Sequence, residues 1–265
     1  MTSIVIGAGL AGLAAAGRLA SAGHDVVVLE RSDTIGGHAS SVTRDGYTFD
    51  EGAHVLFTKD EEVLQAVTAG AGEVTSHEAV IMNYHKGSWI PHPVQCNLHA
   101  LPRRTASECV LSFLDARGDE PIRSYRDWCY ASLGREISER FTFPYTLKYW
   151  TIEPSELAAD WVGERVYRPS REEVIRGALG ASESGDHHYI TTFSYPREGG
   201  YGAFVRGLCD PSLVRTGRQV SHIDWRRRVV SLGDGETLAY DGLVSTMSLP
   251  ELARHVAARV GSRTQ

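Results

Sequence analysis

The sequence predicts an α/β fold in which a parallel sheet is interrupted by a mostly helical insertion. Three observations lead to this prediction. The chain opens on a short apolar strand, a glycine-rich turn and a helix, at residues 3–6, 7–12 and 13–22. Its middle contains segments of helical character, at 107–116, 124–133 and 137–141. Short strand-like runs then return, at 219–225, 229–232 and 241–246.

The first of these segments has the arrangement of a dinucleotide-binding unit. Gly7, Gly9 and Gly12 directly follow an apolar strand, and a second strand over 25–29 ends at Glu30. The first glycine permits a tight turn, the second lets backbone approach a pyrophosphate, and the third lets helix and strand pack closely. The alternative is that the glycines only shape a turn, but the elements around them favour nucleotide binding.

A bound nucleotide would meet this unit at two places. The pyrophosphate is expected at the helix N-terminus, where unpaired N–H groups and the helix dipole favour an anion. Glu30 is placed to accept a hydrogen bond from a ribose hydroxyl. The predicted cofactor-binding residues of the unit are Gly7, Gly9, Leu10, Ala11, Gly12, Glu30 and Arg31.

A second motif decides between nucleotide cofactors. Gly36 and Gly37 follow the unit, and Tyr-Thr-Phe-Asp and Glu-Gly-Ala-His occupy 47–50 and 51–54. This extended pattern resembles the flavin-dependent amine oxidase and protoporphyrinogen oxidase-like superfamily. The resemblance implies FAD rather than NAD, bound to a Rossmann-type domain made of a parallel sheet and a β-hairpin. Adjacent glycines suit a place where a bulky ligand leaves no room for Cβ. The further cofactor-binding residues predicted are Gly36, Gly37, His38, Gly52, Ala53, His54, Val220 and Thr246.

Composition excludes several other classes of protein. The chain has 265 residues, of which 42% are apolar, and a net charge of −6, which argues against general binding to nucleic acid or anionic membranes. No apolar stretch reaches transmembrane length, and the N-terminus lacks the basic region of a signal peptide. The four cysteines have no metal-binding spacing and are interpreted as reduced thiols, so a cytoplasmic protein without a metal site is expected.

The pattern divides the chain into a discontinuous nucleotide domain and an insertion. Residues 1–75 and 195–265 are assigned to the FAD-binding domain, and 76–194 to an inserted substrate-binding domain. The run 241–246 is expected to rejoin the parallel sheet, after the hairpin strands 219–225 and 229–232.

Five ordered motifs narrow the resemblance to one branch. They are Trp-Ile-Pro-His-Pro-Val-Gln-Cys-Asn at 89–97, Phe-Pro-Tyr-Thr-Leu-Lys-Tyr-Trp at 143–150, Trp-Val-Gly-Glu-Arg-Val at 161–166, Phe-Ser-Tyr-Pro-Arg-Glu-Gly-Gly-Tyr-Gly at 193–202 and Leu-Val-Ser-Thr-Met at 243–247. Together they resemble the N-terminal part of UDP-galactopyranose mutases. Relatives continue further and supply a second diphosphate-binding arginine and a last flavin-contacting segment, so the fold is expected to be incomplete and completed by a second polypeptide.

The resemblance implies a covalent reaction without net redox change. In this family, reduced FAD attacks the anomeric carbon of a nucleotide sugar through N5 and expels the nucleoside diphosphate. The sugar ring of the adduct then opens and recloses with a different ring size, and the diphosphate returns. His54 and Arg165 match the residues with catalytic roles, His54 beside the flavin and Arg165 on the substrate diphosphate. The substrate-binding residues implied are Trp89, His92, Gln95, Asn97, Tyr145, Thr146, Trp150 and Arg165.

Each of these assignments has a simpler alternative. Arg165 can instead form a surface ion pair with Glu164 or Glu172, and Trp150 and His54 can be ordinary core residues. His92 and Thr146 stand where the family motif has Tyr and Asn, so a different base or sugar is expected.

Two other functions stay open for the whole chain. One is an FAD-dependent oxidase or desaturase of the amine oxidase class. The other is a truncated FAD-binding subunit that has no activity alone.

Overall fold

The computed structural model describes residues 1–116, 118, 121–163, 165–181 and 190–256. The chain forms two compact units, one of Met1–His77 with Thr192–Gln265 and the other of Glu78–Thr191. We call them the nucleotide unit and the inserted unit. The division made from the sequence alone placed these boundaries at 75/76 and 194/195.

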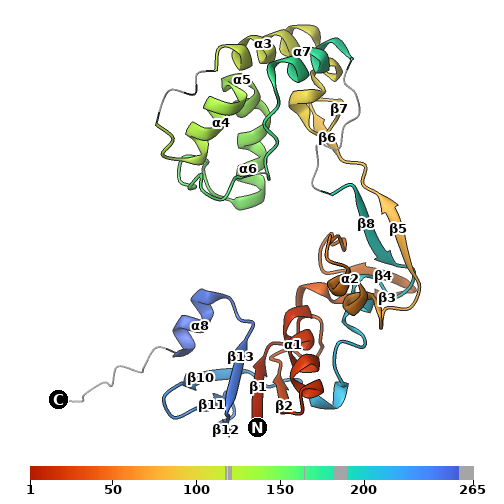
Figure 1. The fold of residues 1–265 in the computed structure, drawn as a ribbon, viewed down its shortest axis with the longest axis vertical. Coiled ribbons are helices and arrows are strands. Elements are labelled where there is room, and N and C mark those ends of the chain that lie inside the picture. The colour runs from red at the N-terminus through yellow and green to blue at the C-terminus, as the bar shows by residue number, and fades with distance from the viewer. Residues whose placement is uncertain (117, 119–120, 164, 182–189, 257–265) are drawn as a thin grey trace, which may run out of the picture. The chain divides into compact units, whose positions relative to one another are not determined.

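A four-stranded parallel sheet is the centre of the nucleotide unit (Figure 1), in the order β13-β1-β2-β9. The strands are β1 (Thr2–Ile6), β2 (Asp25–Leu29), β9 (Val214–Arg215) and β13 (Gly242–Ser245), and helix α1 (Leu10–Ser21) connects the first two. The predicted strand–turn–helix–strand order is confirmed, and so is the return of 241–246 to the sheet beside β1.

The apolar residues of β1 and most of those of β2 are buried, which explains the apolar runs at 4–6 and 26–29. One core cluster joins Val5, Leu13 and Val28 to Phe204, from the segment that follows the inserted unit. The nucleotide unit is therefore built from two sequence segments that share a core.

Smaller elements surround the parallel sheet. The antiparallel sheet β10-β11-β12 (Val220–Asp224, Val229–Leu232, Thr237–Ala239) contains the predicted hairpin. A second hairpin joins β3 (Ser41–Arg44) to β4 (Tyr47–Asp50), and β5 (Val74–Glu78) pairs with β8 (Thr192–Pro196). The nucleotide unit also contains helices α2 (Glu61–Thr68) and α8 (Leu249–Val256).

The inserted unit is mostly helical, as predicted. Hairpin β6–β7 (Met82–His85, Ser88–Pro91) precedes helices α3 (Arg103–Leu114), α4 (Tyr125–Leu133), α5 (Arg135–Ile137), α6 (Phe143–Trp150) and α7 (Arg171–Leu179). Its core contains Ile90, Leu98, Cys109, Leu133 and Ile137.

One helical prediction is wrong in its limits. A helix was expected over 137–141, but α5 passes through a π-helical turn (Ser138–Thr142) into α6, which extends to Trp150. Pro144 explains the π turn because it cannot donate a backbone hydrogen bond and its ring crowds the preceding turn. The Phe143 N–H accordingly donates to the carbonyl of Ser138, five residues back.

Candidate functional site

Two glycines of the first turn are required by backbone geometry. Gly7 has a φ of +98°, and a Cβ there would lie 2.3 Å from Thr246 Oγ1. A Cβ on Gly12 would lie 1.9 Å from the carbonyl oxygen of Gly7. The loop thus folds back on the first turn of α1 at van der Waals contact, as the motif predicts.

The N-terminus of α1 is available for an anion. Gly9 is its N-cap, and within the part of the chain that the structure describes no side chain caps it and no acidic residue lies in its first turn. A Cβ on Gly9 would meet only the Gly36 carbonyl oxygen, at 3.8 Å. These features fit a pyrophosphate, which unpaired N–H groups and the helix dipole attract.

Glu30 fixes the loop from the end of β2. Its side-chain Oε2 accepts from the Ala8 N–H at 2.8 Å, and Oε1 accepts from the Ser32 N–H at 2.8 Å. Each carboxylate oxygen has a second lone pair, so the structure leaves room for the predicted bond from a ribose hydroxyl. The residue is only 9% exposed, and its local role is to hold the turn.

The paired glycines are also required by contacts within the protein. Gly36 and Gly37 have φ angles of +115° and +54°. The Gly36 N–H donates to the Ala8 carbonyl at 2.8 Å, and a Cβ on Gly37 would lie 3.3 Å from Gly9 Cα. The pair lets this segment pack against the nucleotide loop, so the expected bulky ligand is not needed to account for it.

Arg31 and His38, also predicted to bind cofactor, are exposed. The Arg31 guanidinium lies 3.3 Å from Glu251 Oε1. The His38 ring lies 3.5 Å from Glu51 Oε1, and its side chain is 93% exposed. Neither contact prevents either side chain from meeting a ligand.

The sequence analysis missed a polar network centred on Asp50. Its Oδ1 accepts from Ser41 Oγ at 2.7 Å and from the Tyr201 N–H at 2.9 Å, and its Oδ2 accepts from the Tyr195 hydroxyl at 2.5 Å. Burial alone would raise the pKa of Asp50, but the bonds from Tyr195, Ser41 and the Tyr201 backbone, with the charge of His54, lower it below its ordinary value. Asp50 is therefore a carboxylate that ties β4 to β8 and to the segment that follows β8.

Gly200 makes this network possible. Its φ is +65°, and a Cβ there would lie 2.6 Å from Asp50 Oδ1 and from Ser41 Oγ. The Gly202 N–H then donates to Ser41 Oγ at 2.7 Å. The glycines in the motif at 193–202, opposite an aspartate at the end of a strand, were the available sequence signal.

His54 lies beside this network. Its Nδ1 is 3.1 Å from the Gly52 carbonyl, and its ring centroid is 5.3 Å from that of Tyr201. A Cβ on Gly52 would lie 3.2 Å from the imidazole, which explains why glycine suits that position. The Tyr201 ring in turn meets the fully buried Phe204 edge-on. The imidazole is therefore oriented by neighbours on both sides.

The predicted contacts Val220 and Thr246 occupy different settings. Val220 is 4% exposed and begins β10, so only its main chain can meet a ligand directly. Both the N–H and the hydroxyl of Thr246 donate to the Ile6 carbonyl, at 2.9 and 2.8 Å. Thr246 thus packs against the glycine turn and is held there by its two bonds to Ile6.

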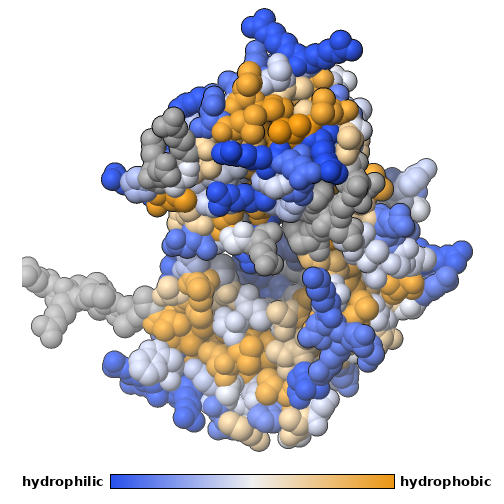
Figure 2. Space-filling model, turned by 45° about the horizontal axis from the view of Figure 1, so that its top comes forward, coloured by the Kyte–Doolittle hydropathy of each residue, from blue (hydrophilic) through white to orange (hydrophobic). Residues whose placement is uncertain are grey.

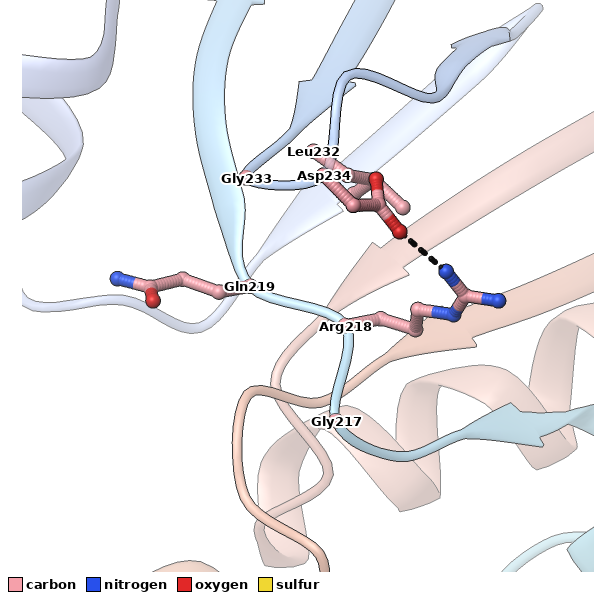
Figure 3. Close-up of a pocket in the computed structure, with 6 residues that line it drawn as sticks. All are labelled: Gly217, Arg218, Gln219, Leu232, Gly233 and Asp234. Carbon is pink, nitrogen blue, oxygen red and sulfur yellow. Dashed lines mark hydrogen bonds and ion pairs between the residues drawn. The ribbon is translucent and has the colours of Figure 1, made fainter.

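A pocket of about 290 Å³ lies next to Val220 (Figure 3). It is lined by Gly217, Arg218, Gln219, Leu232, Gly233 and Asp234. The Arg218 guanidinium pairs with Asp234 at 2.5 Å, while the Gln219 side chain points away from that pair. The Arg218 N–H donates to the Glu30 carbonyl at 2.7 Å, so the pocket lies next to the end of β2.

Three predicted substrate residues of the inserted unit are engaged within the protein. Gln95 is 8% exposed and donates to the Tyr167 carbonyl at 2.9 Å. Thr146 is 2% exposed and donates to the Thr142 carbonyl at 2.7 Å, while Asn97 donates to the Pro93 carbonyl at 3.0 Å. Gln95 and Thr146 are thus buried and bonded within the protein, and their contact with a base stays a prediction.

The other predicted substrate residues lie at the surface. Trp89 is 63% exposed and packs against Tyr84, and His92 is also exposed. On α6, Tyr145 and Trp150 are 62% and 46% exposed. Hydrophobic residues gather at several places on the face of the molecule shown in Figure 2. The aromatic residues of α6 are therefore accessible to a ligand rather than part of the core.

Arg165 is exposed, and its predicted alternative partner Glu172 pairs with another residue. Glu172 pairs with Arg176 at 2.7 Å, and Glu164 lies outside the described residues. Across the described ranges no ion pair involves Arg165. Its N–H donates to the Val162 carbonyl at 2.9 Å, which places it on a turn after Trp161.

Comparison with known proteins places this geometry in a family. The family described as flavin containing amine oxidoreductase matches residues 10–260. The chain belongs to this family. Membership, together with the likeness to a solved mutase described next, implies a flavin cofactor.

Individual relatives of several activities are similar to the chain. A probable UDP-galactopyranose mutase of Klebsiella pneumoniae is 30% identical over 167 residues, 59% of this chain and 42% of that protein. A 4,4'-diapophytoene desaturase of Staphylococcus haemolyticus is 42% identical over 73 residues, 28% of this chain and 14% of that protein.

A solved structure of reduced UDP-galactopyranose mutase gives a TM-score of 0.91 at 26% identity, covering 97% of this chain and 58% of that one. A putative protoporphyrinogen oxidase from Exiguobacterium, at 15% identity and a TM-score of 0.65, shares the fold, with 96% and 61% of the two chains covered. The chain thus spans about half the length of the mutases it matches. Within the described residues, no helix is both long and apolar enough to span a membrane.

Proposed function

We propose that this chain acts in an FAD-dependent nucleotide-sugar mutase of the UDP-galactopyranose mutase type, which interconverts pyranose and furanose forms of a sugar. The observation that carries the proposal is the likeness to the solved reduced mutase, with a TM-score of 0.91 over 97% of the chain. The five sequence motifs shared with that branch support it independently, because they come from both units.

The nucleotide unit fits FAD on its own geometry. The uncapped N-terminus of α1, where a Cβ on Gly9 would come no closer than 3.8 Å to the Gly36 carbonyl oxygen, suits the pyrophosphate, and Glu30 is proposed to accept from the ribose. When bound and reduced, the flavin supplies the nucleophile for the anomeric carbon of the sugar. His54, held between the Gly52 carbonyl and the Tyr201 ring, is assigned to the flavin side of the site.

The inserted unit is assigned to the nucleotide part of the substrate. Arg165 is the residue proposed to bind the diphosphate, because a guanidinium makes two parallel, charge-assisted bonds to phosphate oxygens. Tyr145 and Trp150 offer exposed rings for the base. His92, a departure from the family motif, is proposed to alter the choice of base or sugar.

The substrate site is proposed to need further residues, either from sequence beyond this chain or from a second polypeptide. The matched part is 58% of the solved mutase chain, and a single arginine would leave much of a diphosphate's charge without a partner. Residues equivalent to the rest of that mutase would supply the further cationic and aromatic contacts.

The second candidate is an FAD-dependent oxidase or desaturase. The desaturase relative favours it, since that protein is 42% identical to this chain over 73 residues. That stretch is short, and the likeness to the mutase structure extends over nearly the whole chain, so we place the mutase first. A chain that binds FAD but acts only as a subunit would show flavin binding without turnover.

The test is conversion of nucleotide hexopyranoses under reducing, anaerobic conditions. The full chain is assayed alone and co-expressed with a candidate partner polypeptide, using uridine, guanosine and deoxythymidine diphosphate sugars. Appearance of the furanose form with reduced flavin under these conditions is the expected result. In a parallel aerobic assay, peroxide formation, or desaturation of a polyene with no ring isomerisation, would instead identify the oxidoreductase. Flavin retention with neither activity would leave the subunit.

A further inference from the structure

The segment that follows Arg165 is neither helix nor strand, yet the structure holds it at both ends. At its start, the Arg165 N–H donates to the carbonyl of Val162, a residue that is 1% exposed. At its end, the Ser170 N–H donates to Glu173 Oε2 at 2.7 Å, in the capping box of α7. Residues 166–169 therefore form a short bridge between a buried turn and a helix.

Tyr167 fixes the middle of this bridge from two directions. Its hydroxyl donates to Glu173 Oε1. This bond, together with burial, raises the pKa of Tyr167 to about 12, so the hydroxyl is a donor at neutral pH. The Tyr167 carbonyl accepts from Gln95 Nε2 at 2.9 Å. The side chain and the main chain of one residue are thus bonded to two different elements, α7 and the turn that contains Gln95.

Gln95 makes its bond from a rigid and buried position. It lies in a 3-10 turn (Val94–Cys96) whose three residues are all buried. A Cβ on Gly177 of α7 would lie 2.3 Å from the Cys96 carbonyl oxygen, so the helix and the turn are in direct backbone contact. The Gln95 amide donates to a carbonyl two residues after Arg165. The glutamine therefore links a fixed part of the core to the segment that carries an exposed guanidinium.

We propose that Gln95 is a positioning residue, which holds the segment of Arg165 for binding the diphosphate and does not itself contact the base. This inference rests on the proposed function and deepens it by identifying how the diphosphate arginine is held. Binding an anion with a side chain on an irregular segment costs conformational entropy, because the segment must then be ordered. A bond that orders the segment beforehand lowers this cost and so increases the affinity.

The direction of the Gln95 amide favours this role over the base contact that the sequence motif implies. The amide nitrogen that would donate to a base donates to the Tyr167 carbonyl instead, and the side chain is 8% exposed. Turning it toward a ligand would leave that carbonyl without its donor, which costs free energy. The two roles also concern different parts of the substrate, since a base contact acts on the nucleoside and positioning acts on the phosphates.

The experiment measures the binding of inorganic pyrophosphate and of uridine to the full chain by calorimetry. Gln95→Met removes the donor and keeps the length of the side chain, and Gln95→Glu replaces the amide nitrogen by oxygen. Both variants are expected to raise the Kd for pyrophosphate about three- to tenfold, as the loss of one hydrogen bond, and to leave the Kd for uridine within about twofold. Asn83→Leu, which removes an amide–carbonyl bond from hairpin β6–β7 of the same unit, should change neither Kd.

A double variant separates positioning from a general loss of structure. If Gln95 acts through Arg165, Gln95→Met should weaken pyrophosphate binding no further once Arg165→Gln is present. Hydrogen exchange in the free chain is a second measurement. The bonded amides of Arg165 and Ser170 are expected to exchange faster in Gln95→Met than in wild type, and at the wild-type rate in Asn83→Leu.

Three results would overturn the inference. One is an unchanged Kd for pyrophosphate in both Gln95 variants; a raised Kd for uridine beside it would assign Gln95 to the base. Another is an equal loss of pyrophosphate binding from Gln95→Met with and without Arg165→Gln, which would show that the glutamine acts independently of the arginine. The third is a wild-type chain that does not bind pyrophosphate. None of these decides the proposed mutase function, which the separate assay of ring isomerisation tests.

Discussion

Replacing Asp50 by asparagine tests the network that joins the two sequence segments of the nucleotide unit. The carboxylate accepts three hydrogen bonds, from Ser41, Tyr195 and the Tyr201 N–H. Burial first, and then the bond to Asp50, raise the pKa of Tyr195 to about 12, so its hydroxyl is a donor at neutral pH. In Asp50→Asn the Oδ2 acceptor becomes an NH2 group, which opposes that hydroxyl donor.

The expected cost follows from the bond that is lost. A hydrogen bond to a charged group contributes about 1.5–3 kcal/mol, against about 1 kcal/mol for a neutral one. Since Ser41 and Tyr201 can still donate to the remaining oxygen, we expect Asp50→Asn to lower the free energy of unfolding by about 1.5–3 kcal/mol at pH 7. The measurement is urea unfolding followed by circular dichroism, with Asp160→Asn, at an exposed aspartate of the inserted unit, as control.

The same variant makes a prediction about pH. Because the folded pKa of Asp50 is lowered, its stabilisation is present above the unfolded value of 3.8 and is lost as pH falls through the folded pKa. The difference between wild type and Asp50→Asn should therefore be largest near neutral pH and shrink progressively below pH 3.8. Equal stability of the Asp50→Asn and Asp160→Asn variants at pH 7, or a gap that does not change in acid, would refute the reasoning.

Three further predictions concern residues of the two candidate sites. Gly12→Ala should abolish flavin retention, measured as flavin absorbance per mole of purified protein, because its Cβ would overlap the Gly7 carbonyl; Gly233→Ala, which meets only an ordinary contact, should retain flavin. Arg165→Lys should weaken pyrophosphate binding about tenfold in calorimetry, since lysine cannot make the paired bonds of a guanidinium; an unchanged Kd would remove Arg165 from the site. Gln95→Leu should lower the unfolding free energy by about 1–3 kcal/mol by leaving the Tyr167 carbonyl without its donor, and a stability equal to wild type would show that this bond contributes nothing.

The parts of the fold predicted best from sequence are those determined by neighbouring residues. The turn at Gly7 and Gly12, helix α1 and the buried strands depend on local conformation and on an apolar pattern that has one interpretation. The helix predicted over 137–141 had the wrong bounds because the effect of Pro144 depends on whether the chain can accommodate it in a π turn. A proline by itself more often marks a helix end.

The substrate residues show a different limit of sequence reasoning. A motif identifies which positions are used in relatives but not how deeply each side chain lies. Thr146 and Trp150 share one helix, four residues apart, yet the first is 2% exposed and the second 46%. Positions four apart lie on the same face of a helix, so the difference lies along the helix axis. The Tyr125 side chain bonds Thr146, whereas Trp150 is the last residue of α6.

The nucleotide site itself depends on contacts that cross the insertion. The glycine turn is closed by Thr246, whose hydroxyl bonds the Ile6 carbonyl across 240 positions of sequence. The hairpin that leads to His54 is held through Asp50 by Tyr195 and Tyr201, which follow the insertion. A substitution that breaks one of these contacts, before or after the inserted unit, should therefore disturb the cofactor-binding loop even when the substituted residue does not contact a ligand. Flavin retention is accordingly a measure of whether the two segments have assembled, as well as of the loop that binds the nucleotide.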